Sequence, residues 1–176
     1  MAVKLVKKEL MSDPAAMESF YREARAGAAL NHTNIIHIYT FDEFEGQPYL
    51  VMELANNGSL DTRISKEGSV PELDVLDVGI KVASALASAL KHNLLHRDIK
   101  PENLMISPAG QLVVIDFSIA IARDPRGTQH ALSRAAGSFL YMAPEQVYGF
   151  AAPATDIYSF ALVVFEMLSG KRAGDM

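Results

Sequence analysis

The stretch His96-Arg97-Asp98-Ile99-Lys100-Pro101-Glu102-Asn103 decides how the rest of this chain is interpreted. Taken alone, an aspartate such as Asp98 is more often a loop cap or a solvated carboxylate than a catalytic group. Here the stretch is followed by Asp116-Phe117 and then by Ala143-Pro144-Glu145. The order of the three motifs, rather than any one residue, therefore carries the information about fold and function.

Length and composition limit the class of protein. The chain has 176 residues, of which 49% are apolar and 21% are charged, and it contains no cysteine. These values exclude a wholly disordered chain, a collagen-like chain and a small disulfide-stapled domain. With 16 Lys and Arg against 21 Asp and Glu, the formal charge of −5 argues against a nucleic-acid partner.

The sequence shows no segment suited to membrane insertion or secretion. The longest apolar stretch, Phe160 to Phe165, is far shorter than the roughly 18 residues that suggest a membrane-spanning helix. The first eight residues, Met1-Ala2-Val3-Lys4-Leu5-Val6-Lys7-Lys8, contain no continuous apolar run of the signal-peptide kind. We therefore expect a cytoplasmic setting, with a membrane anchor on a longer parent chain left open.

Turn residues and periodicity divide the chain into strands and helices. Strands are predicted at 3–6, 35–41 and 49–54, and the acidic turn 42–46 joins the last two as an antiparallel pair. A separate hairpin is predicted from 104–107 and 112–116. Helices are predicted from Pro14 to about Leu30, from Pro71 to about His92, and from Asp156 to Ser169, where Gly170 ends the last one. In the middle helix an apolar stripe at helical spacing predicts the packed face: Leu76, Ile80, Ala83, Ala87 and Leu90.

In order and spacing, the three motifs resemble the catalytic loop, the metal-binding motif and the end of the activation loop of eukaryotic-like protein kinases. The sequences of Arg22-Glu23-Ala24 and of the segment from Tyr141 to Gln146 are most similar to those of bacterial Ser/Thr protein kinases. The resemblance implies ATP-dependent phosphorylation of a protein substrate. The pair Lys100-Pro101 is typical of Ser/Thr kinases, which favours a Ser or Thr hydroxyl as acceptor and leaves tyrosine open.

The resemblance also implies which residues do the chemistry. Asp98 would be the catalytic base, and Lys100 would stabilise the transferred phosphoryl group. Asn103 and Asp116 would hold Mg²⁺, which prefers oxygen ligands and takes much of its shell from phosphates and water. Phosphoryl transfer requires such a carboxylate, cation and metal set because negative charge spreads over the phosphoryl oxygens in the transition state.

Further positions are assigned to the nucleotide by resemblance. The segment Met1-Ala2-Val3-Lys4 resembles the V-A-I-K strand motif, so Lys4 would bind the α- and β-phosphates and pair with Glu23 on the first long helix. The segment from Tyr49 to Ala55 resembles the last strand and hinge of the smaller lobe. Its residues would surround adenine, with Met52 as gatekeeper, the backbone of Glu53 and Ala55 on the base edge, and Ala2 and Met105 above and below the base.

Assembly and control are implied in the same way. His96 and Phe117 would stack with Ile38, and Asp156 would anchor the catalytic loop from the last helix. Arg97, beside the catalytic aspartate, marks kinases whose activation loop is ordered by a phosphate. The hydroxyls available in that loop are Thr128, Ser133 and Ser138, of which Ser133 is the preferred phosphorylation site and Ser138 occupies a substrate-facing position.

The expected fold is α+β and two-lobed, with residues 1–54 forming part of the smaller lobe and residues 55–176 part of the larger one. Relative to the family, we expect a kinase domain truncated at both ends. It would lack the Gly-rich loop before Met1 and the helices after Gly170 that cover an apolar face of Ile157, Ala161, Val164 and Leu168. Ser118 also stands where the metal motif has Gly, which restricts the backbone.

Alternatives to an active kinase remain open at this point. One is a catalytically inactive kinase remnant that acts as a protein-binding module. Another, less favoured because of Ala143-Pro144-Glu145, is phosphotransfer to a small molecule. A homodimer of the parent kinase is also left open.

Overall fold

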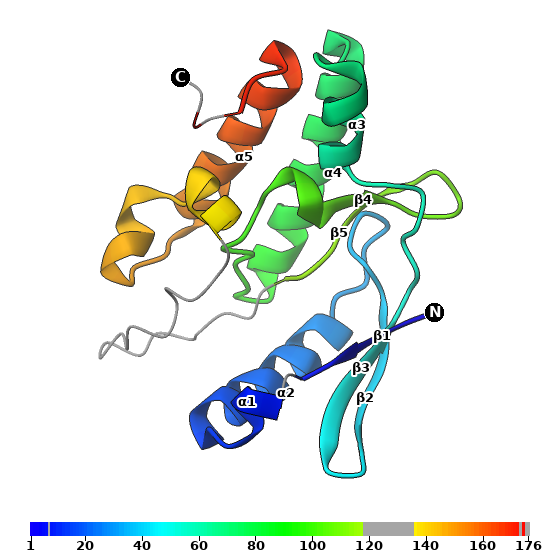
Figure 1. The fold of residues 1–176 in the computed structure, drawn as a ribbon, viewed down its shortest axis with the longest axis vertical. Helices are drawn as coiled ribbons and strands as arrows, with labels where there is room; N and C mark the ends of the chain where they lie inside the picture. The colour runs from blue at the N-terminus through cyan, green and yellow to red at the C-terminus, as the bar shows by residue number, and fades with distance from the viewer. Residues whose placement is uncertain (7, 118–135, 173, 175–176) are drawn as a thin grey trace.

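The computed structural model describes residues 1–6, 8–117, 136–172 and 174, and they form two regions (Figure 1). A small sheet with two α-helices makes up the N-terminal region, and three α-helices with a hairpin make up the C-terminal region. Backbone hydrogen bonds join the two regions. Ile35 forms an isolated β-bridge with Val114, and the Ile36 N–H donates to the Val114 carbonyl at 3.0 Å. The division into lobes at residue 54 stays a prediction.

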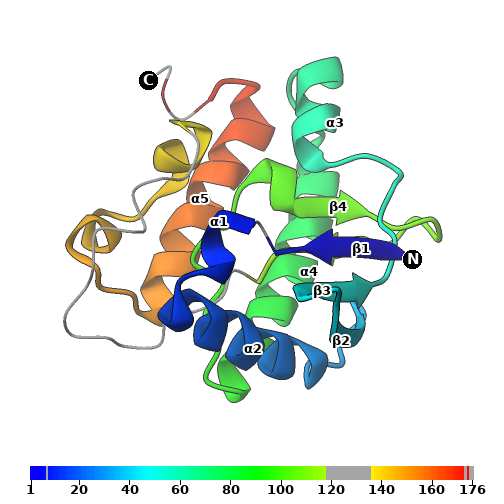
Figure 2. The same ribbon diagram turned by 60° about the horizontal axis from the view of Figure 1, so that its bottom comes forward.

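The N-terminal region is a three-stranded antiparallel sheet in the order β1-β3-β2. Its strands are β1 (Ala2–Leu5), β2 (Ile38–Phe44) and β3 (Gln47–Met52), and its helices are α1 (Lys8–Met11) and α2 (Pro14–Ala28). Helix α2 begins at Pro14 as predicted, where a proline costs no hydrogen bond. It lies beside the sheet in both views (Figures 1 and 2). The sequence did not predict the single turn α1.

The hairpin of β2 and β3 confirms the antiparallel pair but corrects its turn. The acidic residues Asp42 and Glu43 were predicted to lie in the turn, yet they belong to β2 and pair with β3. The turn consists of Glu45 and Gly46, with φ of 51° and 78°. A two-residue hairpin turn with positive φ at both central residues matches the right-handed twist of the strands, which explains why the loop is so short.

Helix α3 (Leu60–Glu67), which follows the segment Asn56-Asn57-Gly58, was not predicted from the sequence. Ser59 caps it, since its hydroxyl accepts the Thr62 N–H at 3.2 Å. Gly68 ends it with φ of 73°. The missed signal was the capping serine directly after the turn.

Helix α4 (Glu72–Lys91) has the predicted bounds within about one residue, but its predicted packed face was wrong. Leu76 and Ile80 are 61% and 63% exposed. The buried positions form a second stripe, one step around the helix: Val75, Val78, Val82, Ala85, Leu86 and Ala89. Both stripes have helical spacing, and contact with the neighbouring helix α5 decides between them.

Helix α5 (Pro153–Ser169) begins before the predicted Asp156, so Thr155 and Asp156 are buried within its first turn, where the Thr155 hydroxyl accepts the N–H of the N-cap residue Ala152 at 2.9 Å. Gly170 ends the helix as predicted, with φ of 67°. The helix lies beside α4 in both views (Figures 1 and 2). Of the apolar face expected to lack cover, Ile157, Ala161 and Leu168 are exposed and Val164 is half-buried.

The core of the C-terminal region joins α3, α4 and α5 to a small hairpin of β4 (Leu104–Ile106) and β5 (Leu112–Val114). That hairpin confirms the predicted pairing of 104–107 with 112–116. Leu60, Val82, Leu104 and Val163 are at most 1% exposed. Residues 96–103 lie between α4 and β4, and Ile99 among them is fully buried in this core. Within the part of the chain that the structure describes, no helix is both long and apolar enough to cross a membrane.

Candidate active site

One buried carboxylate binds the backbone of residues 96 and 97, which follow α4 in the chain. Asp156 of α5 is 4% exposed, and its two oxygens accept the backbone N–H groups of His96 and Arg97 at 2.8 and 2.6 Å. A buried carboxylate is tolerated when hydrogen bonds to both oxygens replace its water. The contact predicted between Asp156 and this loop is therefore present.

His96 ties the same loop to the end of β5. Its Nδ1 accepts the Asp98 N–H at 3.2 Å, so Nε2 carries the proton and donates to the Ile115 carbonyl at 2.9 Å. The ring is fully buried, and burial lowers its pKa, which keeps the imidazole neutral. It also meets the Phe117 ring edge-on, with centroids 4.8 Å apart. The predicted pairing of these two rings is present.

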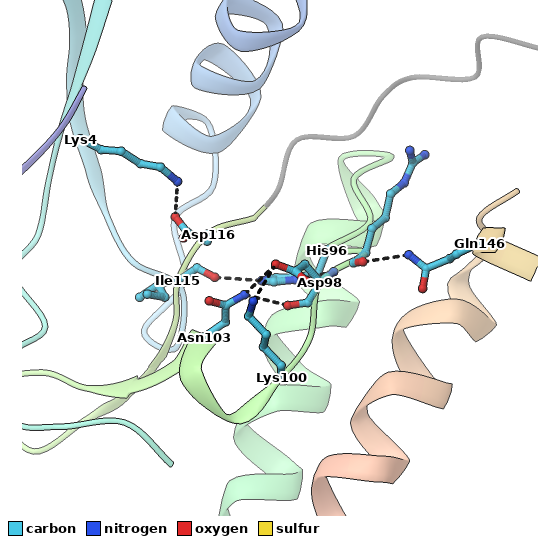
Figure 3. Close-up of polar contacts among 9 residues, drawn as sticks. Lys4, His96, Asp98, Lys100, Asn103, Ile115, Asp116 and Gln146 are labelled. Carbon is cyan, nitrogen blue, oxygen red and sulfur yellow. Dashed lines mark hydrogen bonds and ion pairs between the residues drawn. The ribbon is translucent and has the colours of Figure 1, made fainter. Parts of the chain in front are cut away.

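Asp98 lies close to Lys100 and Asn103, the two polar residues that the sequence motif grouped with it (Figure 3). The Asn103 amide nitrogen donates to the Asp98 carbonyl at 2.8 Å and to its carboxylate Oδ2 at 3.2 Å. The Lys100 Nζ is 3.5 Å from the same Oδ2. Pro101 starts a tight 3₁₀ turn, Pro101–Asn103, which folds the chain back and allows residues 98, 100 and 103 to meet.

Asp116 brings the two regions of the molecule together. Its Oδ1 is 2.5 Å from the Nζ of Lys4 on β1, which is 112 residues away in the sequence (Figure 3). Asp116 is one of the few non-glycine residues with positive φ, at 51°. The predicted partner of Lys4 was Glu23, whose side chain lies outside the described residues, so that pair stays a prediction.

The residues assigned to adenine lie on adjoining backbone. Ala2 on β1 pairs with Met52 on β3, and both are half-buried. The N–H of Glu53 donates to the His37 carbonyl at 2.8 Å, which fixes the chain where β3 ends. Ala55 and Met105 are also half-buried. Their joint role around adenine stays a prediction.

The candidate phosphorylation sites cannot be placed. Thr128 and Ser133 lie outside the described residues, as does Ser118, and so does the side chain of Ser138. The sequence-based choice of Ser133 therefore stays a prediction.

Two groups of functional interest were missed by sequence reasoning. Gln146 donates from its amide nitrogen to the Arg97 carbonyl at 2.9 Å. The Tyr141 hydroxyl donates to Glu166 of α5, whose side chain is almost fully buried, and burial raises the pKa of both groups. Neither contact has a local sequence signal. A Ser or Thr at the N-cap of the turn Pro144–Tyr148, three residues before Gln146, would have signalled a capping box. The N-cap residue is Ala143, whose side chain cannot accept a hydrogen bond.

Comparison with known proteins places these motifs in a family. Residues 1–174 match the protein kinase domain. The chain belongs to the protein kinase family. This confirms the family predicted from the three motifs.

Two named relatives of this kinase-family chain come from bacteria. It is 41% identical over 182 residues to the serine/threonine-protein kinase PknA of Mycobacterium tuberculosis, which covers 99% of this chain and 42% of PknA. It is 34% identical over 171 residues to the serine/threonine-protein kinase PrkC of Bacillus subtilis, covering 97% of this chain and 26% of PrkC. The chain thus spans less than half the length of the curated relatives it matches.

The fold agrees with the family. The crystal structure of the PknI kinase domain of Mycobacterium tuberculosis superposes with a TM-score of 0.76 at 25% identity, over 97% of this chain and 62% of that one. The predicted α+β, kinase-like fold is therefore confirmed.

The donors at this kinase site suit magnesium. The Asn103 amide turns its nitrogen towards Asp98, which leaves its oxygen as the polar atom available to a cation. Asp116 adds a carboxylate. Among the described residues, no group of three or more His, Asp or Glu side chains forms a metal cluster. Two oxygen donors without such a cluster fit Mg²⁺, which is usually bound by one or two protein groups together with substrate phosphates.

Proposed function

We propose that this chain is the catalytic part of a protein serine/threonine kinase, which transfers the γ-phosphoryl group of ATP to a Ser or Thr hydroxyl of a protein. The observation that carries the proposal is the cluster of Asp98, Lys100 and Asn103, with Lys4 and Asp116 paired beside it (Figure 3). These are the side-chain types that phosphoryl transfer requires: a carboxylate, two cations and metal ligands.

In the proposed reaction, Asp98 orients the acceptor hydroxyl and takes its proton. The hydroxyl oxygen forms a new bond to phosphorus while the bond from phosphorus to the bridging oxygen breaks, and ADP leaves with that electron pair. Lys100, held 3.5 Å from Asp98, neutralises charge on the transferred group. Asn103 keeps the Asp98 carboxylate in place through its amide nitrogen.

The nucleotide and the metal use the remaining residues. Asn103 and Asp116 would hold Mg²⁺, which neutralises the developing phosphate charge when it is bound. Lys4 would exchange Asp116 for the α- and β-phosphates, and Glu23 would pair with Lys4 from α2. Met52, the backbone of Glu53 and Ala55, and the apolar side chains of Ala2 and Met105 would enclose adenine. Arg97 and a phosphorylated Ser133 would order the activation segment.

Setting and assembly belong to the same proposal. We place the site in the cytoplasm because ATP is the proposed donor and the chain has no cysteine. Homodimerisation remains a prediction, which the mass of the native protein in solution would test.

The proposal is tested by phosphate transfer from radiolabelled Mg·ATP to casein. We expect Asp98→Asn to lower the transfer rate by at least 100-fold, because the variant cannot accept the proton and loses the local charge. Asp77→Asn is the matched control: it removes one carboxylate from the surface of α4, where Asp77 pairs with Lys81. Wild-type protein that transfers no phosphate, or equal rates in the two variants, would contradict the proposal.

A second function, a non-catalytic module that binds a protein partner, is favoured by the exposed apolar stripe of α4. Leu73, Leu76 and Ile80 on that helix are all more than 60% exposed. A folded chain with neither transfer nor a rise in melting temperature with Mg·ATP would favour this function.

A further inference from the structure

The side-chain amide of Gln146 uses both of its ends. It lies in the 3₁₀ turn Pro144–Tyr148, where its oxygen accepts the Ala143 N–H at 2.9 Å. Its nitrogen donates to the Arg97 carbonyl, also at 2.9 Å, across 49 residues of sequence (Figure 3). One amide therefore joins the segment after the Ala143-Pro144-Glu145 motif to the catalytic loop.

The accepting carbonyl belongs to a residue in an unfavourable conformation. Arg97 has φ of 64°, in the left-handed region that residues with a Cβ rarely occupy. Such a conformation persists only where the surroundings hold it. The Arg97 N–H is held by Asp156 at 2.6 Å, and the Arg97 carbonyl is held by Gln146. Each of the two peptide groups that flank the Arg97 Cα thus has its own side-chain partner.

The second of these peptide groups leads directly to Asp98. A peptide is planar, so a fixed carbonyl direction also fixes the N–H of Asp98 on the opposite side. That N–H donates to His96 Nδ1 at 3.2 Å, and the Asp98 Cα at the end of the plane carries the carboxylate. Any rotation of the plane would move the carboxylate relative to Lys100 and Asn103.

We propose that Gln146 is a positioning residue for Asp98, and that its amide nitrogen sets the plane of the peptide between Arg97 and Asp98. The inference rests on the proposed phosphoryl transfer, because it assigns a role at that site. Gln146 does not touch the reacting atoms; it acts through the backbone. Its position also means that the loop geometry depends on where the turn Pro144–Tyr148 lies.

A purely local role would need only half of the amide. The oxygen alone satisfies the Ala143 N–H and caps the start of the 3₁₀ turn, whereas the nitrogen contributes nothing to that turn. Gln146→Glu separates the two halves, because a carboxylate oxygen still accepts from Ala143 while the other oxygen faces the Arg97 carbonyl without a donor. Gln146→Met removes both hydrogen bonds without adding charge. Gln111→Glu, on the exposed β4–β5 turn, is the matched control for the added charge.

The first test is steady-state kinetics of the whole chain with Mg·ATP and casein. A displacement of about 1 Å at a reacting group can cost about 100-fold in rate. We expect kcat to fall 10- to 100-fold in Gln146→Glu and Gln146→Met, with KM for ATP within twofold of wild type, and Gln111→Glu to match wild type. A kcat within twofold of the control in either variant would overturn the inference, and so would an effect confined to KM.

Hydrogen exchange of the Asp98 amide separates this inference from the proposed function. If wild-type protein transfers no phosphate, the proposed function fails. The exchange rate of the Asp98 amide would still test whether Gln146 positions the peptide between Arg97 and Asp98. Exchange at least tenfold faster in both Gln146 variants than in Gln111→Glu, with the amides of α4 unchanged, supports a loss of peptide positioning. Unchanged exchange at Asp98, or acceleration shared by the α4 core, overturns it, because the latter means general destabilisation.

Discussion

At the scale of single residues, His96 shows how burial and hydrogen bonding select one chemical form. Its ring accepts from the Asp98 N–H on one side and donates to the Ile115 carbonyl on the other, and no third polar partner is needed. Only the neutral tautomer with the proton on Nε2 satisfies both contacts. A charged ring would have to place an N–H against the N–H of Asp98, so ionisation is opposed by geometry as well as by burial.

This arrangement predicts a pH dependence of stability. Burial lowers the folded-state pKa of His96 below its usual value, so the unfolded chain binds the proton more tightly. The stability that His96 contributes is therefore complete above a pH of about 6.5 and is lost as the pH falls below it, by up to about 1.4 kcal/mol per pH unit. Urea unfolding of wild type and His96→Gln between pH values of about 5 and 7.5 measures this difference.

The comparison with His96→Gln matters because Glu166 titrates with the opposite sign. Its pKa is raised by burial, so its contribution falls as the pH rises through the window above the usual glutamate value. Both proteins contain Glu166, so its effect cancels in the difference. A difference between the two proteins that stays constant over this pH range would contradict the role of His96.

At the scale of elements, α4 shows why periodicity identifies a helix more reliably than it identifies the packed face. The helix carries two apolar stripes that are displaced by about one residue, or about 100°. Both stripes mix large and small residues: Ala83 and Ala87 lie on the exposed stripe with Leu76 and Ile80, whereas Leu86 lies on the buried one. The second stripe is buried because α4 packs against α5 and β5 in the core, which the sequence of α4 cannot reveal by itself.

The two faces predict different responses to the same kind of substitution. Val82→Ala should lower the free energy of unfolding by about 2 kcal/mol, because Val82 is fully buried and the change leaves a cavity. Leu76→Ala should change it by less than about 0.5 kcal/mol, because Leu76 is mostly exposed and alanine favours helix. Urea unfolding of both variants checks the expectation. A larger cost for Leu76→Ala would show that the exposed stripe is covered in solution.

The first part of α5 illustrates the same point for polar residues. Thr155 and Asp156 have the composition of helix caps, which is why the sequence predicted one of them as the start of the helix. Pro153 begins the helix instead, and the two polar side chains point into the molecule. The Thr155 hydroxyl donates to Glu145 at 2.6 Å, while Asp156 binds the catalytic loop. Thr155 keeps a local capping contact, because its hydroxyl also accepts the N–H of the N-cap residue Ala152 at 2.9 Å, and the tertiary hydrogen bonds are added to it.

At the scale of the whole molecule, the ion pair between Lys4 and Asp116 joins the two regions at the proposed nucleotide site. The side chains are 48% and 37% exposed, so the pair should contribute no more than about 1 kcal/mol to stability. Its importance would then lie in binding. Lys4 is held close to Asp116, the aspartate of the proposed metal site, and in that proposal it would exchange this partner for phosphate.

We therefore expect Lys4→Met to leave the melting temperature without ligand within about 2 °C of wild type, since an exposed ion pair contributes little. The rise in melting temperature that Mg·ATP produces in wild type should be lost. Thermal unfolding with and without Mg·ATP measures both values, and Lys66→Met, on the surface of α3, is the matched control. An unchanged Mg·ATP effect in Lys4→Met would contradict a phosphate role for Lys4.

The sequence by itself determined the family, the order of the motifs and the type of most elements. These features depend on neighbouring residues: turn chemistry at Gly170, a proline at the start of α2, and the short spacing that brings Asp98, Lys100 and Asn103 together. Only the tertiary structure decided the packed face of α4, the pairing of Lys4 with Asp116 and the contact of Gln146 with Arg97. Each of these depends on which distant segments meet in space, and local spacing carries no information about that.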